Sequence, residues 1–184
     1  MLEGLAGHLA GRFAPDEFAR PVERKKMVKL IELQDADFDW LLSENAPTRG
    51  GLIPTAGGVD QPFVLNLVRR MTRRLAEAGC RGAWMVVADT EVVGLCSYKA
   101  PPSEGQAEIG YGIAASRRNL GYATFAVQAI IEAARKEGAL EALVAETAAA
   151  NPSSERVLEK NGFCRVGQRD GPDDGPTNMW RLVL

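Results

Sequence analysis

The spacing of hydrophobic residues predicts secondary structure along most of the chain after residue 26. Apolar and polar residues alternate over 27–33, which is the pattern of a half-buried strand. Asp35 and Asp37, followed by apolar residues at helical spacing, predict a short helix next. A second helical period runs over 63–78. Between the helices, 45–62 is rich in Gly and Pro and has no period. A loop of that length within a compact domain is usually functional or disordered.

Three strands are predicted next, over 83–88, 91–99 and 106–113. The first two are joined by a connection short enough for a hairpin. Along the third, larger apolar residues occupy one face, while Glu108, Gly110 and Gly112 occupy the other. Small residues along a strand face allow another group to approach the backbone closely.

The second half of the chain alternates between helix and strand. Helices are predicted over 122–138 and 151–162, and strands over 140–147, 163–168 and 179–184. The last two strands flank an acidic segment, 168–177, that is predicted to be a loop. Antiparallel strands followed by a strand–helix–strand crossover predict an α/β fold with a mixed sheet. One domain over 27–184 follows, preceded by an arm of residues 1–26.

Composition removes several classes of function. The 184 residues carry a formal net charge of −2, which gives no general attraction to nucleic acid or to an anionic membrane. No apolar run approaches the roughly 20 residues that span a bilayer, and the first ten residues lack the basic start of a signal peptide. Cys80, Cys96 and Cys164 are far apart in the sequence and form no CxxC pair. This favours reduced, buried thiols in the cytoplasm over disulfides or zinc.

The single histidine narrows the chemistry further. His8 lies in a Gly-rich stretch near the start of the chain. Catalysis by a Ser-His-Asp or Cys-His arrangement requires a histidine at the site, and so does an HExxH zinc site. We expect His8 to be a solvated terminal residue, and we expect no metal and no covalent acyl-cysteine.

The segment 116–123 joins the predicted strand 106–113 to a helix N-terminus, whose free amides form an anion site. Gly121 and Ala123 keep side chains small there, and Arg117 and Arg118 add positive charge. Just before it, residues 110–115 match G-x-G-x-x-A, the dinucleotide fingerprint. That motif requires the helix to begin within it, whereas these glycines lie inside a strand. A nicotinamide-dependent enzyme is therefore disfavoured.

Three motifs occur in order along the chain: Glu108-Ile109-Gly110-Tyr111, Gly121-Tyr122-Ala123-Thr124 and Asn151-x-x-Ser154-x-x-Val157-Leu158-Glu159-Lys160-Asn161-Gly162-Phe163. They make the chain similar to the ribosomal-protein N-terminal acetyltransferases, a branch of the GNAT N-acyltransferases. In addition, Arg118-x-x-Gly121-x-Ala123 matches the R/Q-x-x-G-x-G/A motif of that superfamily. The resemblance is strong over 83–167, weaker over 27–82, and does not extend to 1–25.

The resemblance implies a fold and a co-substrate. The fold is a mixed central sheet of six to seven strands flanked by helices, with acetyl-CoA bound in a split between the fourth and fifth strands, here 106–113 and 140–147. It also implies that strand backbone near Ile113 and Ala115 pairs with the pantetheine and that the loop 118–123 takes the diphosphate. The cofactor-binding residues that it implies are Ile113, Ala115, Arg118, Asn119, Gly121, Ala123, Thr124 and Asn151.

The chemistry requires a neutral amine, a polarised carbonyl and a stabilised leaving thiolate. Glu108 is the candidate base, acting through water, since it projects from the small-residue face beside the split. It is alternatively an exposed carboxylate or a residue that orients the acceptor. A backbone amide near Gly110 would polarise the carbonyl. Ser154 matches the serine of the resembled motif and is a candidate to hydrogen-bond the sulfur, or else a helix cap. Many relatives have a tyrosine acid where this chain has Leu158.

These features support an N-acetyltransferase that acts by direct attack in a ternary complex. The acceptor is a primary amine, either a protein N-terminus or a small molecule. The alternative is a non-catalytic acyl-CoA-binding domain with a regulatory role. No nucleic acid or membrane partner is expected, and the expected oligomeric state is a monomer or a homodimer. The segments 45–62 and 168–177 are expected to flank the acceptor entrance, as in the resembled family.

Overall fold

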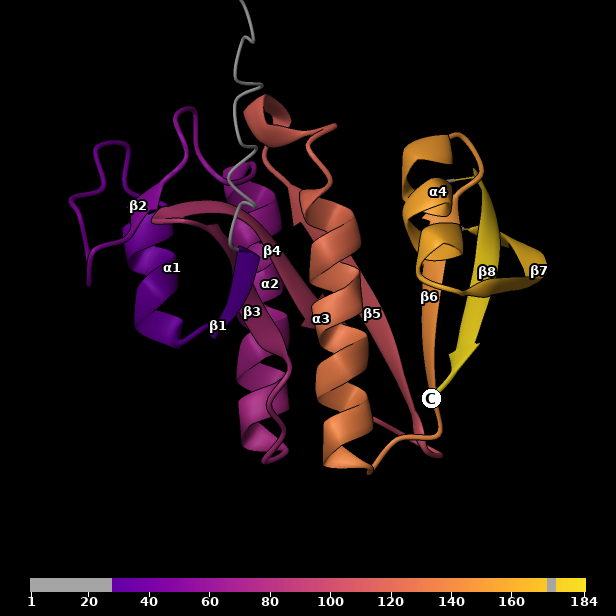
Figure 1. Cartoon of the computed structure of the whole chain (residues 1–184). Coiled ribbons are helices and arrows are strands. Elements are labelled where there is room, and N and C mark those ends of the chain that lie inside the picture. Colours follow the sequence, from indigo (N-terminus) through magenta and orange to yellow (C-terminus); the bar gives the residue numbers. More distant parts are fainter. Residues whose placement is uncertain (1–27, 172–174) are drawn as a thin grey trace, which may run out of the picture.

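One mixed sheet organises a computed structural model of the chain, which describes residues 28–171 and 175–184 (Figure 1). The predicted arm, residues 1–26, lies outside the described residues. The strands are β1 Val28–Glu32, β2 Ile53–Pro54, β3 Ala83–Ala88, β4 Glu91–Tyr98, β5 Gln106–Ile113, β6 Ala142–Ala148, β7 Cys164–Gly171 and β8 Gly175–Val183. The helices are α1 Asp35–Leu41, α2 Pro62–Glu77, α3 Tyr122–Glu137 and α4 Pro152–Lys160.

The strand order is β1-β3-β4-β5-β6-β8-β7. The strands β1, β3, β4 and β5 pair antiparallel in that order, whereas β5 and β6 pair parallel through the crossover helix α3. This confirms the predicted mixed sheet. One short strand was not foreseen: β2 lies inside the predicted loop 45–62 and pairs parallel with β4.

The expectation of a loop over 168–177 was wrong. The strand β7 continues to Gly171 and β8 begins at Gly175, with Gln168 opposite Asn178 and Asp170 opposite Pro176. Acidic residues, Gly and Pro disfavour strands when they are judged one segment at a time. The hydrogen bonds of the facing strand satisfy the backbone here and override that preference.

Helices cover both faces of the sheet, and each face has its own core. On one face, α3 and α4 pack on β5 and β6 through Ile109, Ala126, Ile130, Leu143 and Leu158, all nearly inaccessible to solvent. On the other face, α1 and α2 pack on β3 and β4 through Phe38, Trp40, Leu65, Met85 and Leu95. Cysteine Cys96 is buried in the first core, Cys80 is half-buried, Cys164 is exposed, and all three are free thiols.

An ion-pair cluster fixes α2 against α1. The carboxylate of Asp35 accepts hydrogen bonds from Arg69 at 2.8 and 2.7 Å and from Arg73 at 2.7 and 3.0 Å. These bonds to Arg69 and Arg73 hold the pKa of Asp35 well below its usual range. They set the place of α2 over the sheet, where the helix forms one wall of the cavity described below.

The strands β5 and β6 separate at one end, and this is the predicted split. They pair from Gln106 opposite Ala142 to Ile109 opposite Ala145 and no further. Beyond that point β5 stays paired to β4, and β6 stays paired to β8 up to Ala148. Each strand therefore follows its other neighbour, and Figure 1 shows β6, β8 and α4 diverging from β5 and α3.

Candidate active site

The backbone of β5 directs hydrogen-bonding groups into the split. The Lys99 amide donates to the Glu108 carbonyl at 2.8 Å, and the Ala114 amide donates to the Val93 carbonyl at 2.9 Å. In an antiparallel ladder the two backbone groups of a residue point the same way and successive residues alternate. The even-numbered residues of β5 therefore bond to β4, and the backbone groups of Tyr111 and Ile113 point toward the split.

This alternation changes one expectation from the sequence. Gly110 stands opposite Ser97 in the β4 ladder, so its amide points away from the split. The amide that faces the split at this point belongs to Tyr111. At Ile113, the expected pantetheine contact, the amide faces the split, while the carbonyl accepts a hydrogen bond from Nε of Arg118 at 3.2 Å.

The chain turns sharply between β5 and α3. A 3₁₀ turn covers Ala115–Arg117, Asn119 has φ 61°, and Gly121 has φ 82° at the N-cap of α3. A left-handed φ favours glycine, because any Cβ is strained there. No side chain in the described part of the chain caps α3. The turn thus brings six of the predicted residues to one helix end: Ala115, Arg118, Asn119, Gly121, Ala123 and Thr124.

The two arginines of this turn differ in what they bind. Arg117 forms a bidentate pair with Glu91, through Nε at 3.0 Å and Nη2 at 2.8 Å, and this pair raises the pKa of Arg117. Its charge is therefore matched by a carboxylate and ties the turn to β4. The side chain of Arg118 is exposed and makes the bond to Ile113 given above. Arg118 thus remains the better candidate for an anion.

A hydrogen bond spans the split between β5 and α4. The phenol oxygen of Tyr111 lies 2.7 Å from Oγ of Ser154 and donates to the Ser154 carbonyl at 3.1 Å. Burial, opposed by the bond to Ser154, raises the pKa of Tyr111 to about 12. The sequence placed Tyr111 on an apolar face and gave it no chemical role. Its phenol was the signal, because a buried tyrosine hydroxyl usually finds a polar partner.

Ser154 is not the cap of α4. The cap is Asn151, whose Oδ1 accepts a hydrogen bond from the Ser154 amide at 3.2 Å. This corrects the alternative interpretation of Ser154 and leaves its hydroxyl with Tyr111. Asn151 is exposed, and Leu158 is fully buried in the core under α4. The side chain at position 158 thus packs in the core.

Charged side chains collect on the other face of the split. Glu108 pairs with Lys99 at 2.5 Å, and both side chains are about one-third exposed, at 34% and 36%. Because β5 and β6 are parallel and Glu108 stands opposite Val144, Glu146 lies on the same face as Glu108. Glu146 binds Arg169 through both carboxylate oxygens, at 2.9 and 2.7 Å. The sequence identified neither Lys99 nor Glu146.

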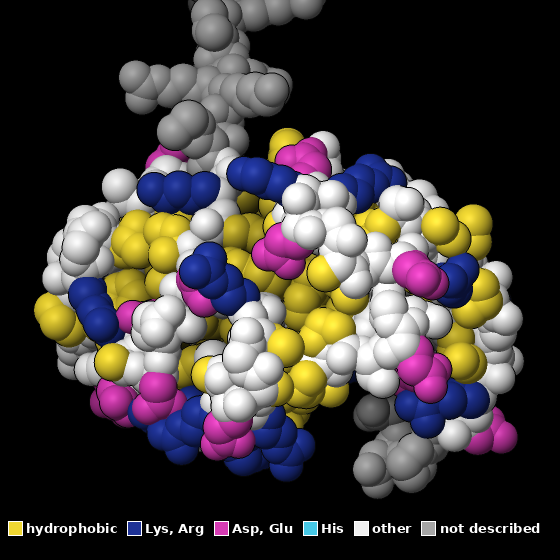
Figure 2. All heavy atoms as spheres, turned by 90° about the horizontal axis from the view of Figure 1, so that it is seen from below, with side chains coloured by type: hydrophobic (Ala, Val, Ile, Leu, Met, Phe, Trp, Pro, Cys, Tyr) yellow, Lys and Arg dark blue, Asp and Glu magenta, His cyan; other side chains and the backbone are white. Residues whose placement is uncertain are grey.

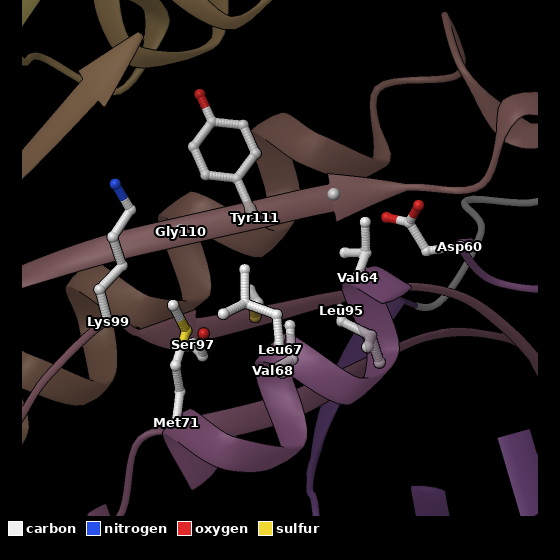
Figure 3. A pocket seen from close by; sticks show the side chains of 12 residues that line it. Asp60, Val64, Leu67, Val68, Met71, Leu95, Ser97, Lys99, Gly110 and Tyr111 are labelled. Atoms are coloured by element: carbon white, nitrogen blue, oxygen red, sulfur yellow. The ribbon is translucent and has the colours of Figure 1, made fainter. Parts of the chain in front are cut away.

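A cavity of about 160 Å³ opens on this same face (Figure 3). Its lining residues are Asp60, Val64, Leu67, Val68 and Met71, Leu95, Cys96, Ser97 and Lys99, and Gly110, Tyr111 and Gly112. The α2 side chains point toward β5, whereas the Tyr111 ring points away from α2. The lining of the cavity between α2 and the sheet is therefore mostly apolar, and Asp60 and Lys99 are its charged residues.

Two glycines let the charged members reach β5. A Cβ at Gly110 would stand 3.6 Å from the Lys99 side chain, and one at Gly112 would stand 3.2 Å from Oδ2 of Asp60. The space over Gly112 is thus occupied by a carboxylate. Asp60 comes from the predicted loop 45–62, which therefore contributes to the cavity. Of the acidic residues in 168–177, Asp170 is exposed, and Asp173 and Asp174 lie outside the described residues.

The described residues contain no helix long and apolar enough to cross a membrane, and no cluster of three or more His, Cys, Asp or Glu placed to hold a metal ion. Figure 2 shows one face of the molecule, on which Lys and Arg are interspersed with Asp and Glu around hydrophobic side chains. That mixture agrees with the near-neutral net charge.

Comparison with known proteins identifies the family of the chain. Residues 28–164 match the family model for an acetyltransferase (GNAT) domain. A ribosomal-protein-serine acetyltransferase of Escherichia coli (strain K12) is 31% identical over 94 residues, which are 50% of this chain and 52% of that protein. The chain thus matches about half the length of this curated relative.

Solved structures agree on the fold. A RimL ribosomal L7/L12 alpha-N-protein acetyltransferase in complex with coenzyme A has TM-score 0.63 and 19% identity, covering 85% of this chain and 94% of that one. Aminoglycoside acetyltransferase AAC(6')-Ib with coenzyme A has TM-score 0.61 and 20% identity, covering 85% and 95%. A GNAT-family acetyltransferase from Bacillus anthracis has TM-score 0.60 and 19% identity, covering 86% and 96%. The fold expected from the sequence is confirmed.

Proposed function

Since the chain belongs to the GNAT acetyltransferase family, we propose that it transfers the acetyl group of acetyl-CoA to a primary amine by direct attack within a ternary complex. The observation that carries the proposal is the split itself. Where β5 leaves β6, its backbone groups at Tyr111 and Ile113 face an opening that leads toward the N-terminus of α3. An extended amide-bearing arm ending in phosphates is complementary to that arrangement.

The co-substrate side of the proposal uses mainly backbone. The amides of Ile113 and Ala115 pair with the pantetheine arm as a neighbouring strand would. The diphosphate lies against the start of α3, where Gly121, Ala123 and Thr124 expose amides and the helix dipole favours negative charge. Arg118 and Asn119 complete that side with exposed polar side chains. Asn151 faces the arm from α4, and its cap bond to Ser154 uses only Oδ1, so its NH₂ group is available as a donor.

The acetyl-transfer chemistry uses the two sides of β5. The acceptor attacks as a neutral amine, and Glu108, through water, takes the proton that the nitrogen loses as the N–C bond forms, from the face that carries the cavity. The Tyr111 amide donates to the carbonyl oxygen as negative charge develops on it. The electron pair of the breaking C–S bond passes to sulfur, beside the Ser154 hydroxyl. No acyl-enzyme intermediate is required. Burial raises the pKa of Cys96 above its usual range, so that thiol is a poor nucleophile.

The cavity favours an acceptor with an apolar group beside its amine. Four side chains of α2 that line it are aliphatic or Met, namely Val64, Leu67, Val68 and Met71. A strongly polar polyhydroxylated amine would leave its hydroxyls without partners against that wall. A protein N-terminus with an apolar residue near the amine fits better, with Asp60 near the mouth to attract its positive charge. The curated relative named above is itself named for a ribosomal protein.

The test is turnover with a panel of acceptors. Acetyl-CoA is incubated with peptides whose N-terminal residues are apolar, acidic or basic, and with polyamines and amino sugars, and thiol release is followed. Release with apolar N-terminal peptides above the other classes is the expected result. No release with any acceptor, despite binding of acetyl-CoA by calorimetry, would instead support the second candidate.

That second candidate is a non-catalytic acyl-CoA-binding domain with a regulatory role. The observation in its favour is Leu158, which is fully buried where many relatives carry a tyrosine acid. The wider proposal also includes a cytoplasmic location, supported by three free thiols. The proposed oligomeric state is a monomer or homodimer, and the proposal includes neither nucleic acid nor a membrane as a partner.

A further inference from the structure

We propose that Tyr111 and Ser154 form a pair of hydrogen-bond donors that stabilises the CoA thiolate as it leaves. This inference rests on the proposed acetyl transfer and adds to it a residue that neither the sequence nor the comparisons assign. The pair reaches the split from two elements, with Tyr111 on β5 and Ser154 on α4.

The position of the pair is set by the sheet. The last residue of β5 that pairs with β6 is Ile109, opposite Ala145, and Tyr111 follows two residues later. Its phenol crosses to the first turn of α4, where Ser154 follows the cap residue Asn151. The contact therefore bridges the split close to the point where it opens. An arm that pairs with β5 from Ile113 inward brings its sulfur end to this point.

The protons of the pair can be counted. A phenol has one proton, and a carbonyl oxygen only accepts. When Tyr111 donates to the Ser154 carbonyl at 3.1 Å, the Ser154 hydroxyl is left to donate to the phenol oxygen at 2.7 Å. A thiolate in the split offers a charged acceptor in place of a neutral carbonyl, and hydrogen bonds to charged groups are stronger. The phenol then turns its proton to sulfur while Ser154 supports the phenol oxygen.

The proton remains on the phenol. Burial raises the pKa of Tyr111 to about 12, whereas a thiol such as that of cysteine has a pKa of about 8.5. Complete transfer from phenol to thiolate is therefore uphill by roughly 3 to 4 pKa units. Tyr111 acts as a donor that keeps its proton throughout the working pH range. In the transfer step the N–C bond forms, the C–S bond breaks, the amine proton goes to Glu108, and the thiolate takes its proton from solvent after release.

The experiment compares two leaving groups under single-turnover conditions. Tyr111→Phe and Ser154→Ala are each assayed with acetyl-CoA and with acetyl-seleno-CoA, whose leaving selenolate is less basic and needs less stabilisation. With the thioester we expect the rate of Tyr111→Phe to fall about 10- to 100-fold, the worth of one hydrogen bond to a charged group. With the selenoester we expect a fall of less than about 3-fold, while the affinity for CoA measured by calorimetry stays unchanged.

Tyr98→Phe is the matched control. Tyr98 lies on β4 and is more deeply buried than Tyr111, and burial raises its pKa to about 12 as well. Its removal should affect both esters equally. An equal loss on both esters for Tyr111→Phe would show a packing role and overturn the inference, as would an unchanged thioester rate. Wild type is measured alongside the variants. If wild type acetylated no amine at all, the proposed function and the inference would be overturned together.

Discussion

Arg169 reaches across β8 to bind Glu146. Its Nε and Nη2 atoms donate to the two carboxylate oxygens at 2.9 and 2.7 Å. Arg169 is on β7 and Glu146 is on β6, and β8 lies between these strands. The ion pair therefore braces three strands at the level where β6 has left β5. It holds one wall of the split by charge, in the region where the β5–β6 ladder no longer holds it.

This pair should give the fold a measurable dependence on pH. The hydrogen bond from Arg169 lowers the pKa of Glu146 below its usual range. A carboxyl whose pKa is lower in the folded state adds stability above its unfolded pKa, about 4.3 for Glu, and loses it as the pH falls through the folded value. We expect Glu146→Gln to unfold at lower urea concentration than wild type at pH 7, with the two curves converging toward pH 3.

The control for this prediction is Glu104→Gln, which removes an exposed carboxylate in the turn before β5. Its unfolding midpoint should differ little from wild type at either pH. A constant gap between Glu146→Gln and wild type from pH 7 to pH 3 would show that the charge of Glu146 does not matter.

Substitution of the glycines at the two ends of α3 should distinguish an effect on the stability of the fold from an effect on CoA binding. Gly121 precedes the helix with φ 82°, Gly138 ends it with φ 67°, and a Cβ at either meets no atom closer than 4.0 Å. Alanine at each position should cost about 1 to 2 kcal/mol of unfolding free energy, from the left-handed backbone alone. Only Gly121→Ala should weaken CoA binding in calorimetry, because it disturbs the backbone at the proposed diphosphate site.

If both alanine variants bound CoA with wild-type affinity while losing the expected stability, the diphosphate would have to lie elsewhere. Equal weakening by both variants would point to a general loosening of α3. Urea unfolding of each variant, run beside the calorimetry, distinguishes these outcomes.

Much of the fold follows from local patterns, because each buried face imposes its own period. The alternation in 106–113 places Ile109 in the core and Glu108 on the opposite face, and both are found there. The segment 168–177 shows the limit of such reasoning. Residues 169–171 pair with 175–177 within the same segment, although acidic residues, Gly and Pro disfavour strands when each side is judged alone. The short strand β2 was missed for a different reason, since its pairing with β4 is a long-range contact.

The candidate site follows most directly from the sequence where function lies in the backbone. A glycine before a helix marks the turn at Gly121 without knowledge of the rest of the chain. Side chains that meet from different elements leave no such mark. Tyr111 and Ser154 are 43 residues apart in the sequence, and their contact depends on how far β6 diverges from β5. Lys99 and Glu108 meet because the turn between β4 and β5 brings the two strands side by side.

The two carboxylates on the acceptor face should differ in their effect on catalysis. If Glu108 is the base, Glu108→Gln should lower kcat with an amine acceptor by about 10²- to 10⁴-fold. Glu146→Gln, on the same face but bound to Arg169, should lower kcat by much less. Both are measured as pH–rate profiles at saturating acetyl-CoA. A larger loss in Glu146→Gln would transfer the role of base to Glu146.

Substitution of Gly112 should change acceptor binding without changing CoA binding. A Cβ there would stand 3.2 Å from Oδ2 of Asp60, so the larger side chain of Gly112→Val must displace Asp60 and narrow the cavity between β5 and α2. We expect the KM of a peptide acceptor to rise about 10-fold or more, because the acceptor loses a favourable contact with the Asp60 charge and the room for about one apolar group in the cavity. Gly110→Ala is the matched change on the same face, because its Cβ meets Lys99 only at 3.6 Å, an ordinary contact distance. It should leave the KM nearly unchanged. A rise in the dissociation constant for CoA with no change in the acceptor KM would place the acceptor outside this cavity, and the apolar wall of α2 would then have no part in selecting it.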